Sequence, residues 1–420
     1  MESRPLITGC FLGCTAAALA VWFAILAAAP LSASTWKGRE LRQKYREAPL
    51  KLGPFRIQPA FMLSNAGYDS NVYYRPEAVA DYWLTAGPAF DIYLPVKKKF
   101  LVHVFESPQY VYFFKTKSER TWNNYLNADA NFLFNRFLVS AGGALNDARE
   151  RWSSEIDYRP RRKEEAWFGS LLWQASGKTS LTVGLRRVRY LYESILFEDV
   201  DLKQRLDREE VYAGATVFYQ AGSRMRIFLE GEYGVFDFKN PANPGDSWSR
   251  AAFAGVEFSP FGRVRGRIRL GFKEFDIREA GRPGFRGIVG DSSVSIRLLK
   301  AVSVRGSYRR DVRFSVWSGN FFYIEDWAGL GSSLYLLRRK IRLDFDYGQG
   351  LNSYPSASLD ENPWPGRRKD RFLVRSAGLY FRLRGDVGLG LTVGMFRKTI
   401  NIYGWDAERK FASLNLTYEF

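Results

Sequence analysis

The segment Ala412–Phe420 alternates apolar and polar side chains without a break, and this rhythm constrains the fold more than any other feature. One face of the segment carries Ala412, Leu414, Leu416, Tyr418 and Phe420. The other face carries Ser413, Asn415, Thr417 and Glu419. A period of two residues is the signature of a β-strand whose two faces meet different environments. The segment is therefore predicted to be a strand with one apolar face and one wetted face.

The N-terminus carries a different signal. An apolar run, Phe11–Leu31, follows Arg4 and ends at small residues up to Ala33. This pattern predicts a secretory signal peptide over residues 1–33, cleaved after Ala33. The alternative is an uncleaved membrane anchor, because the run is long enough to span a bilayer. Both cysteines, Cys10 and Cys14, lie inside the run, so the mature chain is expected to contain no disulfide and no cysteine-based metal site.

After Ala33 no apolar run approaches the ~18 residues that a membrane helix needs. Backbone groups in lipid must be hydrogen-bonded within the protein, so such a chain can span a membrane only as a closed barrel. Strand-like alternation begins near Phe55 and continues to the end of the chain. Short turns such as Pro95–Lys98 alternate with longer polar stretches such as Trp152–Arg162, as in barrels with short periplasmic turns and long outer loops.

The pattern predicts an all-β fold, a transmembrane antiparallel up-and-down β-barrel of about 18 strands, with 16 to 18 as the range. The barrel is assigned to residues 55–420, and a basic N-terminal periplasmic segment to residues 34–54. The alternative class is a large soluble β protein such as a propeller. Propeller blades repeat a signature motif, and no such repeat occurs in this sequence.

Composition agrees with a barrel that has aromatic girdles, since the 420 residues include 12 Trp, 23 Tyr and 33 Phe. The formal net charge of +18 indicates an anionic partner, which in an exported protein points to lipopolysaccharide, an acidic polysaccharide or anionic solutes. The export signal argues against nucleic acid. The predicted location is the outer membrane of a Gram-negative-type bacterium, and the predicted assembly state is a monomer.

The clearest strand is Arg263–Lys273, in which basic residues alternate with apolar ones. An arginine on the lipid face would cost ~2–4 kcal/mol near the membrane midplane, so the basic face is predicted to look into the lumen. Two later strands show the same alternation of inward polar or charged residues with outward apolar ones. The predicted anion path is lined by Arg265, Arg267, Arg269, Lys273, Arg305, Arg309 and Arg342, which we call the arginine ladder.

Two interpretations of the arginine ladder stay open at this stage. A wall of lumen cations would concentrate and steer anions along the pore. Alternatively, nearby carboxylates would neutralise the wall and leave ordinary ion pairs; the candidates are Glu230, Glu232, Asp344 and Asp346.

Catalysis is not expected. His103 is the only histidine, and Ser107 lies about 13 Å from it along an extended strand. A barrel enzyme that uses His103 is therefore the less favoured hypothesis, and no cofactor or metal is predicted. Asp69, Asn71 and Asp81 have oxygen ligands suited to Ca²⁺, but Asx turns explain these residues more simply.

The stretch Asn65–Tyr73, followed by Asp81 and Thr85–Phe90, resembles the first hairpin of outer-membrane β-barrel proteins that accompany bacterial exopolysaccharide and capsule synthesis. The terminal Leu416, Tyr418 and Phe420 resemble the signal that the barrel-assembly machinery recognises. The resemblance implies a role in passing or anchoring a polysaccharide at the outer membrane. The expected function is a porin-like channel for an anionic polysaccharide or anionic solutes, and the alternative is a structural or adhesive barrel with a plugged lumen.

Overall fold

The computed structural model describes residues 43–96, 99–134, 136–197, 199–317, 319–357, 367–384, 386–401 and 405–419. The predicted signal peptide with its cysteines, and Phe420 of the predicted assembly signal, lie outside these ranges. Residues 43–47 are helical, and Ala48 after them is buried against Tyr93 and Leu101. In the described ranges, no helix combines the length and apolar character needed to cross a membrane.

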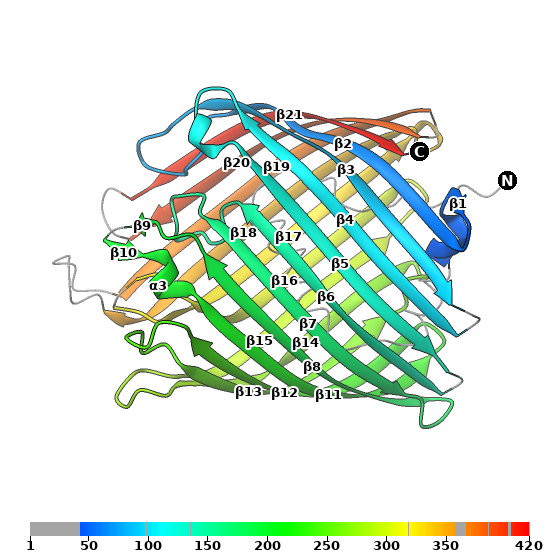
Figure 1. Cartoon of the computed structure of the whole chain (residues 1–420), viewed down its shortest axis with the longest axis horizontal. Coiled ribbons are helices and arrows are strands. Elements are labelled where there is room, and N and C mark those ends of the chain that lie inside the picture. The colour runs from blue at the N-terminus through cyan, green and yellow to red at the C-terminus, as the bar shows by residue number, and fades with distance from the viewer. Residues whose placement is uncertain are drawn as a thin grey trace.

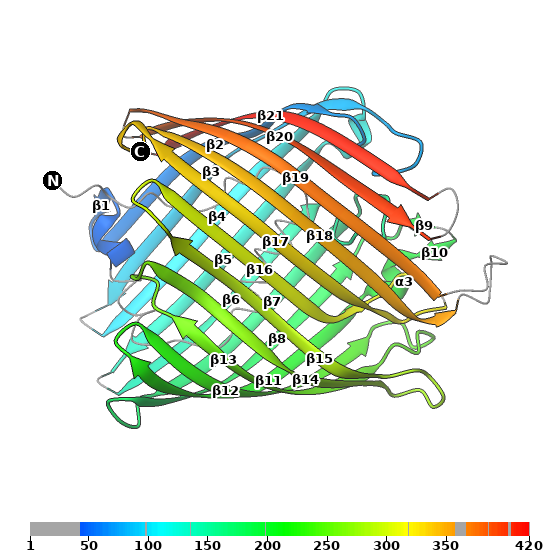
Figure 2. The same ribbon diagram turned by 180° about the vertical axis from the view of Figure 1, so that it is seen from behind.

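The main feature of the fold is one closed antiparallel sheet. Of its nineteen described strands, the short β1 (Leu50–Leu52) pairs with the start of β2, and the other eighteen form the barrel. The barrel closes where β2 (Phe55–Asp69) pairs with β21 (Ala407–Glu419), from Ala60 opposite Glu419 to Asp69 opposite Phe411. Figures 1 and 2 show the tilted strands of the two walls. The prediction of an up-and-down barrel with 18 strands is confirmed.

The other strands of the barrel follow in chain order. The first group is β3 (Asp81–Val96), β4 (Phe100–Phe113), β5 (Thr121–Leu133), β6 (Phe137–Arg149), β7 (Arg161–Trp173), β8 (Thr179–Tyr192), β11 (Arg208–Gly222), β12 (Met225–Phe238) and β13 (Ser247–Phe258). The second group is β14 (Val264–Ile277), β15 (Phe285–Arg297), β16 (Val302–Phe314), β17 (Phe322–Leu336), β18 (Ile341–Ala357), β19 (Arg367–Arg384) and β20 (Val387–Ile400). The loops and turns contain η1 (Lys117–Glu119), β9 (Leu196–Phe197), β10 (Val200–Asp201), α3 (Leu202–Leu206) and η2 (Leu337–Arg339).

The two ends of the barrel differ. Short turns join β3 to β4, β17 to β18 and the other strand pairs at the end that also holds the C-terminus, on the right in Figure 1. Longer connections, including the one with α3, β9 and β10, gather at the opposite end. We call these the inner end and the outer end. The turn predicted at Pro95–Lys98 falls between β3 and β4, and the polar stretch Trp152–Arg162 falls at the connection between β6 and β7.

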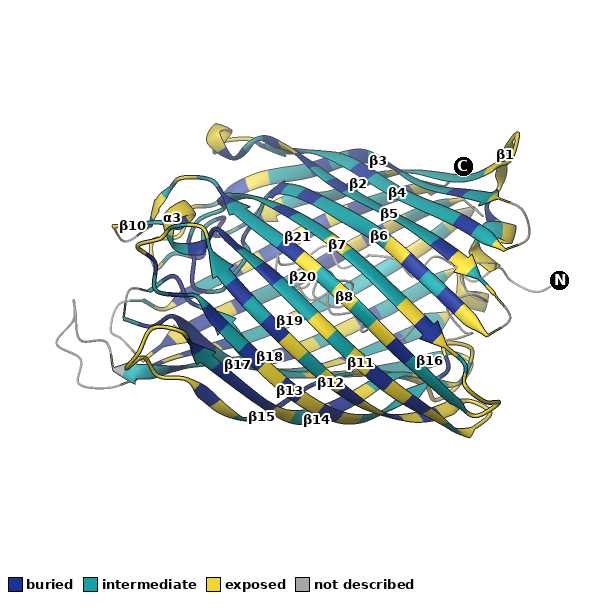
Figure 3. Ribbon diagram, turned by 60° about the horizontal axis from the view of Figure 1, so that its bottom comes forward, coloured by how far each residue is buried: buried dark blue, intermediate teal, exposed yellow. Residues whose placement is uncertain are grey.

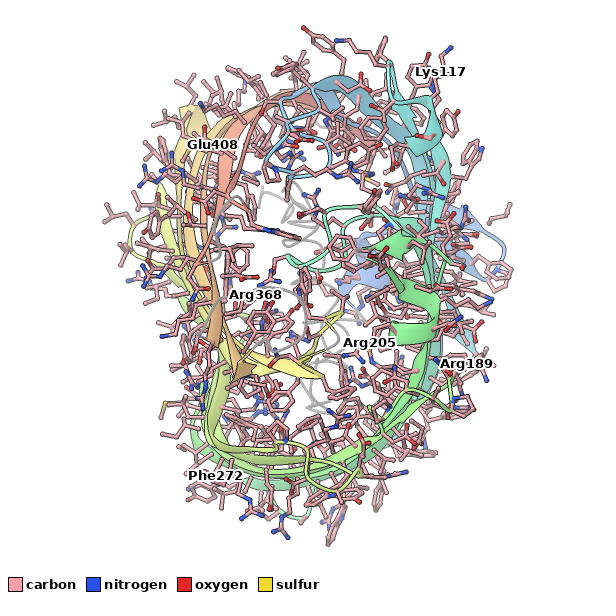
Figure 4. The ribbon with its side chains drawn as sticks, turned by 90° about the vertical axis from the view of Figure 1, so that its left-hand side faces the viewer. Lys117, Arg189, Arg205, Phe272, Arg368 and Glu408 are labelled. Atoms are coloured by element: carbon pink, nitrogen blue, oxygen red, sulfur yellow. The ribbon has the colours of Figure 1, made fainter. Side chains whose placement is uncertain are left out.

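Side chains alternate between the two faces of the wall, as Figure 3 shows by the colours along each strand. On β14, Ile268, Leu270 and Phe272 point outward and are 39%, 50% and 54% exposed. Arg267 and Arg269, which alternate with these residues, point inward, with 12% and 10% of their side chains exposed. Viewed from the outer end, the wall is an oval with Phe272 on its outside and Arg205 and Arg368 inside it (Figure 4).

The wall opens between β15 and β16 toward the outer end. The pairing of β15 with β16 ends at Gly290 opposite Arg310, although β15 extends to Phe285 and β16 extends to Phe314. The strands β16 and β17 stay paired up to Phe314 opposite Phe322. Phe314 packs on Phe236 and Phe275 of the inward face. The outer part of the β16–β17 hairpin therefore leaves the wall and folds into the barrel (Figure 4).

Candidate functional site: a bridged lumen lined with arginines

The seven residues of the arginine ladder lie on the inward faces of β14, β16 and β18, in register with one another. The residues Ser293 and Ser295 of β15 separate Arg267 of β14 from Arg305 of β16. Six of the seven cations meet a carboxylate on their own strand or on a strand one or two places away in the sheet. The ion pairs are Arg267–Glu230 at 2.6 Å, Lys273–Asp311 at 2.6 Å, Arg305–Asp346 at 2.8 Å, Arg309–Glu325 at 2.7 Å and Arg342–Asp344 at 2.9 Å, and Arg269 pairs with both Glu230 and Asp291.

Arg265 differs from the other members of the ladder. Its side chain is exposed, and in the described part of the chain no carboxylate lies within ion-pair distance of it. Three of the four carboxylates proposed from the sequence as neutralising groups, Glu230, Asp344 and Asp346, do pair with ladder residues. The inward wall is thus a mixed lattice of charges, with Arg265 as its free cation near the inner end.

The sequence reasoning missed three other partners, Asp291, Asp311 and Glu325. Their inward parity is readable from the two-residue period of each strand. Which arginine each one reaches depends on the register between strands, and the sequence does not specify that register.

The loop between β6 and β7, residues 150–160, enters the lumen, and we call it the bridge loop. Its Glu155 is 1% exposed. The Ser315 hydroxyl and the Tyr354 hydroxyl each donate a hydrogen bond to Oε1 of Glu155, and both distances are 2.7 Å. Tyr354 belongs to β18, and β7 and β18 are nine strands apart in either direction around the closed sheet. The bridge loop therefore crosses from one wall to the opposite one.

A second polar contact holds the bridge loop to the far wall. Lys398 on β20 is 1% exposed, and its Nζ atom lies 2.8 Å from Oδ1 of Asp157. The same ammonium group donates to the carbonyl oxygen of Ser154 at 3.3 Å. A buried ammonium group is tolerated only when it is paired and hydrogen-bonded, so Lys398 fixes the position of the loop.

Apolar packing supports these polar contacts. Ile156 of the bridge loop is buried in a cluster with Leu202 and Leu206 of α3, Val316 of the β16–β17 connection and Phe197. Leu202 and Leu206 are one helical turn apart, and the Asp201 side chain caps the short helix by accepting from the backbone N–H of Lys203. Three outer connections thus pack on each other inside the mouth of the barrel.

The outer half of the lumen also contains a cluster of aromatic side chains, which we call the aromatic cluster. It comprises Phe236, Phe253, Phe275, Phe285, Phe321 and Phe322, with Val289, Ile277 and Ala251. These side chains come from the inward faces of β12–β15 and from the infolded hairpin. Edge-to-face pairs such as Phe275–Phe322, with ring centroids 5.2 Å apart, are typical of a packed core.

The electrostatics of the bridge loop follow from burial. Loss of water raises the pKa of Glu155, and the positive charge of Arg368 with the hydrogen bonds from Ser315 and Tyr354 opposes that rise. Burial also lowers the pKa of the Arg151 guanidinium to about 10. The Arg151 guanidinium lies 3.2 Å from the centre of the Tyr74 ring, a cation–π contact.

His103 lies on the inward face of β4, between two carboxylates. Its Nε2 atom is 2.7 Å from Oδ1 of Asp91, and its Nδ1 atom is 3.1 Å from Oδ1 of Asp129. Ser107, the candidate nucleophile, instead donates to the carbonyl oxygen of Pro88 at 3.2 Å. Both imidazole nitrogens are therefore occupied by aspartates, and this arrangement does not activate Ser107.

The other candidate sites are also accounted for. Asp69 forms an ion pair of 2.8 Å with Arg409 and accepts from the backbone N–H of Asn71, which is the Asx turn. In the ranges that the structure describes, no three His, Cys, Asp or Glu residues are grouped so as to hold a metal ion. Tyr418 of the predicted assembly signal lies on the outward face of β21 and is exposed, with Leu416 on the same face.

Several solved structures are similar in fold to this chain. OccK2 (OpdF) of Pseudomonas aeruginosa, solved in complex with glucuronate, aligns with a TM-score of 0.50 and 10% identity over 87% of this chain and 98% of its own. A BenF-like porin from Pseudomonas fluorescens Pf-5 gives the same values. OccK3 (OpdO) of Pseudomonas aeruginosa is 14% identical over 87% of this chain and 95% of its own, with a TM-score of 0.48. At 10% identity, the likeness to OccK2 and to the BenF-like porin shows a shared barrel fold.

No protein-family model matches the chain, and neither does a curated protein sequence.

Proposed function

We propose that this protein is an outer-membrane channel for small anionic solutes, and not an enzyme. The observation that carries the proposal is the inward arginine ladder in a closed barrel of eighteen strands, a size that can enclose an aqueous path. The free cation Arg265 and the exchangeable ion pairs beyond it offer successive binding positions to a carboxylate or phosphate group. OccK2 holds glucuronate in its solved structure, so a barrel with this fold can accommodate a small acidic sugar.

An acidic polysaccharide, which the resemblance of the first hairpin suggests, is the wider version of the same proposal. A polymer needs a continuous open path, and the bridge loop and aromatic cluster occupy the outer half of the lumen. Small solutes are therefore the better fit. A structural barrel with a closed lumen is the competing proposal, and the same two features favour it.

Ion selectivity in planar bilayers tests the proposal. We expect the wild-type barrel to conduct, with a reversal potential in a KCl gradient that shows anion preference. The triple variant Arg265→Ser, Arg305→Ser and Arg309→Ser should lose most of that preference, because three lumen charges are removed.

A matched control is Arg187→Ser with Arg250→Ser, which removes outward-facing cations and should leave selectivity unchanged. Cation preference in the wild-type protein would contradict the anion channel. The lack of any conductance would favour the closed structural barrel.

A further inference from the structure

The residues on the outer surface of the wall change from apolar to charged or polar at one level along the strands. On β20 the outward residues Leu389, Leu391 and Val393 are apolar and exposed, and two positions beyond Met395 comes Arg397. Neighbouring strands change in the same way, from apolar residues near the inner end to a charged or polar residue nearer the outer end. Charged side chains avoid the hydrocarbon core, so this level marks its outer boundary.

Around most of this boundary, outward cations are paired with outward carboxylates. Arg187 on β8 lies 2.7 Å from Glu209 on β11. Arg286 on β15 lies 2.6 Å from Glu274 on β14, and Arg250 on β13 pairs with the same glutamate. In these stretches of the boundary each of the cations named has a carboxylate partner.

The wall of β19, β20 and β21, seen in Figure 2, departs from this balance. Its outward cations are Arg367 at the start of β19 and the five residues Lys369, Arg371, Arg375, Arg397 and Lys410, and we call these five the cationic patch. Glu408 is the one carboxylate among the described outward positions of these strands. It is shared by Arg397 and Lys410, each at 2.8 Å.

The members of the cationic patch are neighbours across the sheet. Arg375 stands opposite Met395, and Met395 stands opposite Lys410. Arg397 stands between Leu373 and Glu408. In the described chain, neither Arg371 nor Arg375 has a carboxylate within ion-pair distance. Five cations against one carboxylate leave a concentrated positive field on this side of the barrel.

We propose that the cationic patch binds the phosphorylated headgroup of lipopolysaccharide, the glycolipid of the outer leaflet. Guanidinium and ammonium groups are the side chains that bind phosphate oxygens, arginine through paired hydrogen bonds. Directly toward the inner end lie Leu391, Val393 and Leu414, which are exposed and offer an apolar surface to acyl chains. A ligand that satisfies both zones needs an anionic head and hydrocarbon tails, arranged as in this glycolipid. The inference rests on the outer-membrane location in the proposed function.

The test compares two triple variants of the full-length protein, each made in a Gram-negative host and purified from its outer membrane in mild detergent. The patch variant is Arg371→Ser, Arg375→Ser and Lys410→Ser. The matched control is Arg187→Ser, Arg250→Ser and Arg286→Ser, which removes three paired cations. Native mass spectrometry counts the lipopolysaccharide retained per barrel. The patch variant should retain at least roughly tenfold less lipopolysaccharide than the wild-type protein. The control should retain nearly as much lipopolysaccharide as the wild type.

Equal retention in the patch variant and the wild type would overturn the inference, as would an equal loss in both triple variants. A heat-modifiable gel shift verifies that each variant is folded. If the patch triple fails to fold, Arg371→Gln with Lys410→Gln takes its place. A wild-type barrel that is absent from the outer membrane would refute the proposed function itself, and its presence there with unchanged lipid retention would refute the patch alone.

Discussion

The inner and outer halves of the lumen are built on the same strands but stabilised by different forces. In the inner half, Arg267 and Glu230 face each other across a charged wall, and Arg265 stays exposed. In the outer half, Phe275 and Phe322 pack face to edge, and the bridge loop spans the space between opposite walls. The difference teaches that, under the proposed function, selectivity and resistance to flow would belong to separate parts of this barrel. The arginine ladder lines the inner half, whereas the aromatic cluster and the bridge loop, which the Lys398–Asp157 ion pair holds in place, narrow the outer half.

Removal of the bridge loop should give the largest effect. Replacement of residues 152–158 by a short Gly–Ser turn leaves β6 and β7 intact and removes both contacts to the far wall. We expect single-channel conductance to rise several-fold, because the segment that crosses the lumen is gone. An unchanged conductance would show that the narrowest part of the path lies elsewhere, in the inner half.

Truncation of the aromatic cluster should come next. Phe275 is 2% exposed, so Phe275→Ala should lower the free energy of unfolding by about 3–5 kcal/mol. Denaturant unfolding followed by the loss of the folded gel band measures this change. The inner-half substitution Arg265→Ser should change stability by less than about 0.5 kcal/mol, because that side chain is exposed. Similar losses of the free energy of unfolding in Phe275→Ala and Arg265→Ser would contradict the contrast between the two halves of the lumen.

A single buried charge should have a more local effect. Lys398→Met leaves Asp157 without its cation and should weaken the attachment of the bridge loop by about 3 kcal/mol. Faster and larger fluctuations of the single-channel current are the expected readout. Lys369→Met, on the outward face of the neighbouring strand, is the control and should leave the current as quiet as in the wild type.

The smallest expected effect is a dependence on pH. Burial raises the pKa of Glu155 above 4.5, so the proton is bound more tightly in the docked loop than in the released one. The docked bridge loop is then most stable below pH 4.5 and loses stability as pH rises to the raised pKa. As pH rises over this range, the bridge loop should leave its docked position more often, and the state of higher conductance should be observed more often. Glu155→Gln should abolish this dependence, and an unchanged pH profile in that variant would assign it to another group.

Much of the wall could be predicted from the sequence. Each strand obeys a period of two because lipid and water sit on opposite faces, and one misplaced arginine would cost ~2–4 kcal/mol. This local rule was enough for the strand number, the positions of the turns, and the outward placement of Ile268 and Leu270.

The interior was not predictable in the same way. Glu155, Ser315 and Tyr354 meet inside the barrel although 199 residues separate the first from the last. No local pattern marks a polar loop as one that folds inward instead of into water. The same limit applies to the β16–β17 hairpin, whose alternation reads like any other wall strand although its outer part leaves the wall.

The junction of β2 with β21 has a consequence for biogenesis. Ionic contacts such as Arg409–Asp69 join residues 340 positions apart. The barrel therefore closes only when β21 pairs with β2. Contacts at such separation form late, after the entropy of a very long loop has been overcome. Until then the partly formed sheet has two unpaired edge strands, which can pair with strands of other chains. A chain that stops short of residue 407 would lack β21 and keep both edges of the sheet unpaired, so it would be a template for aggregation.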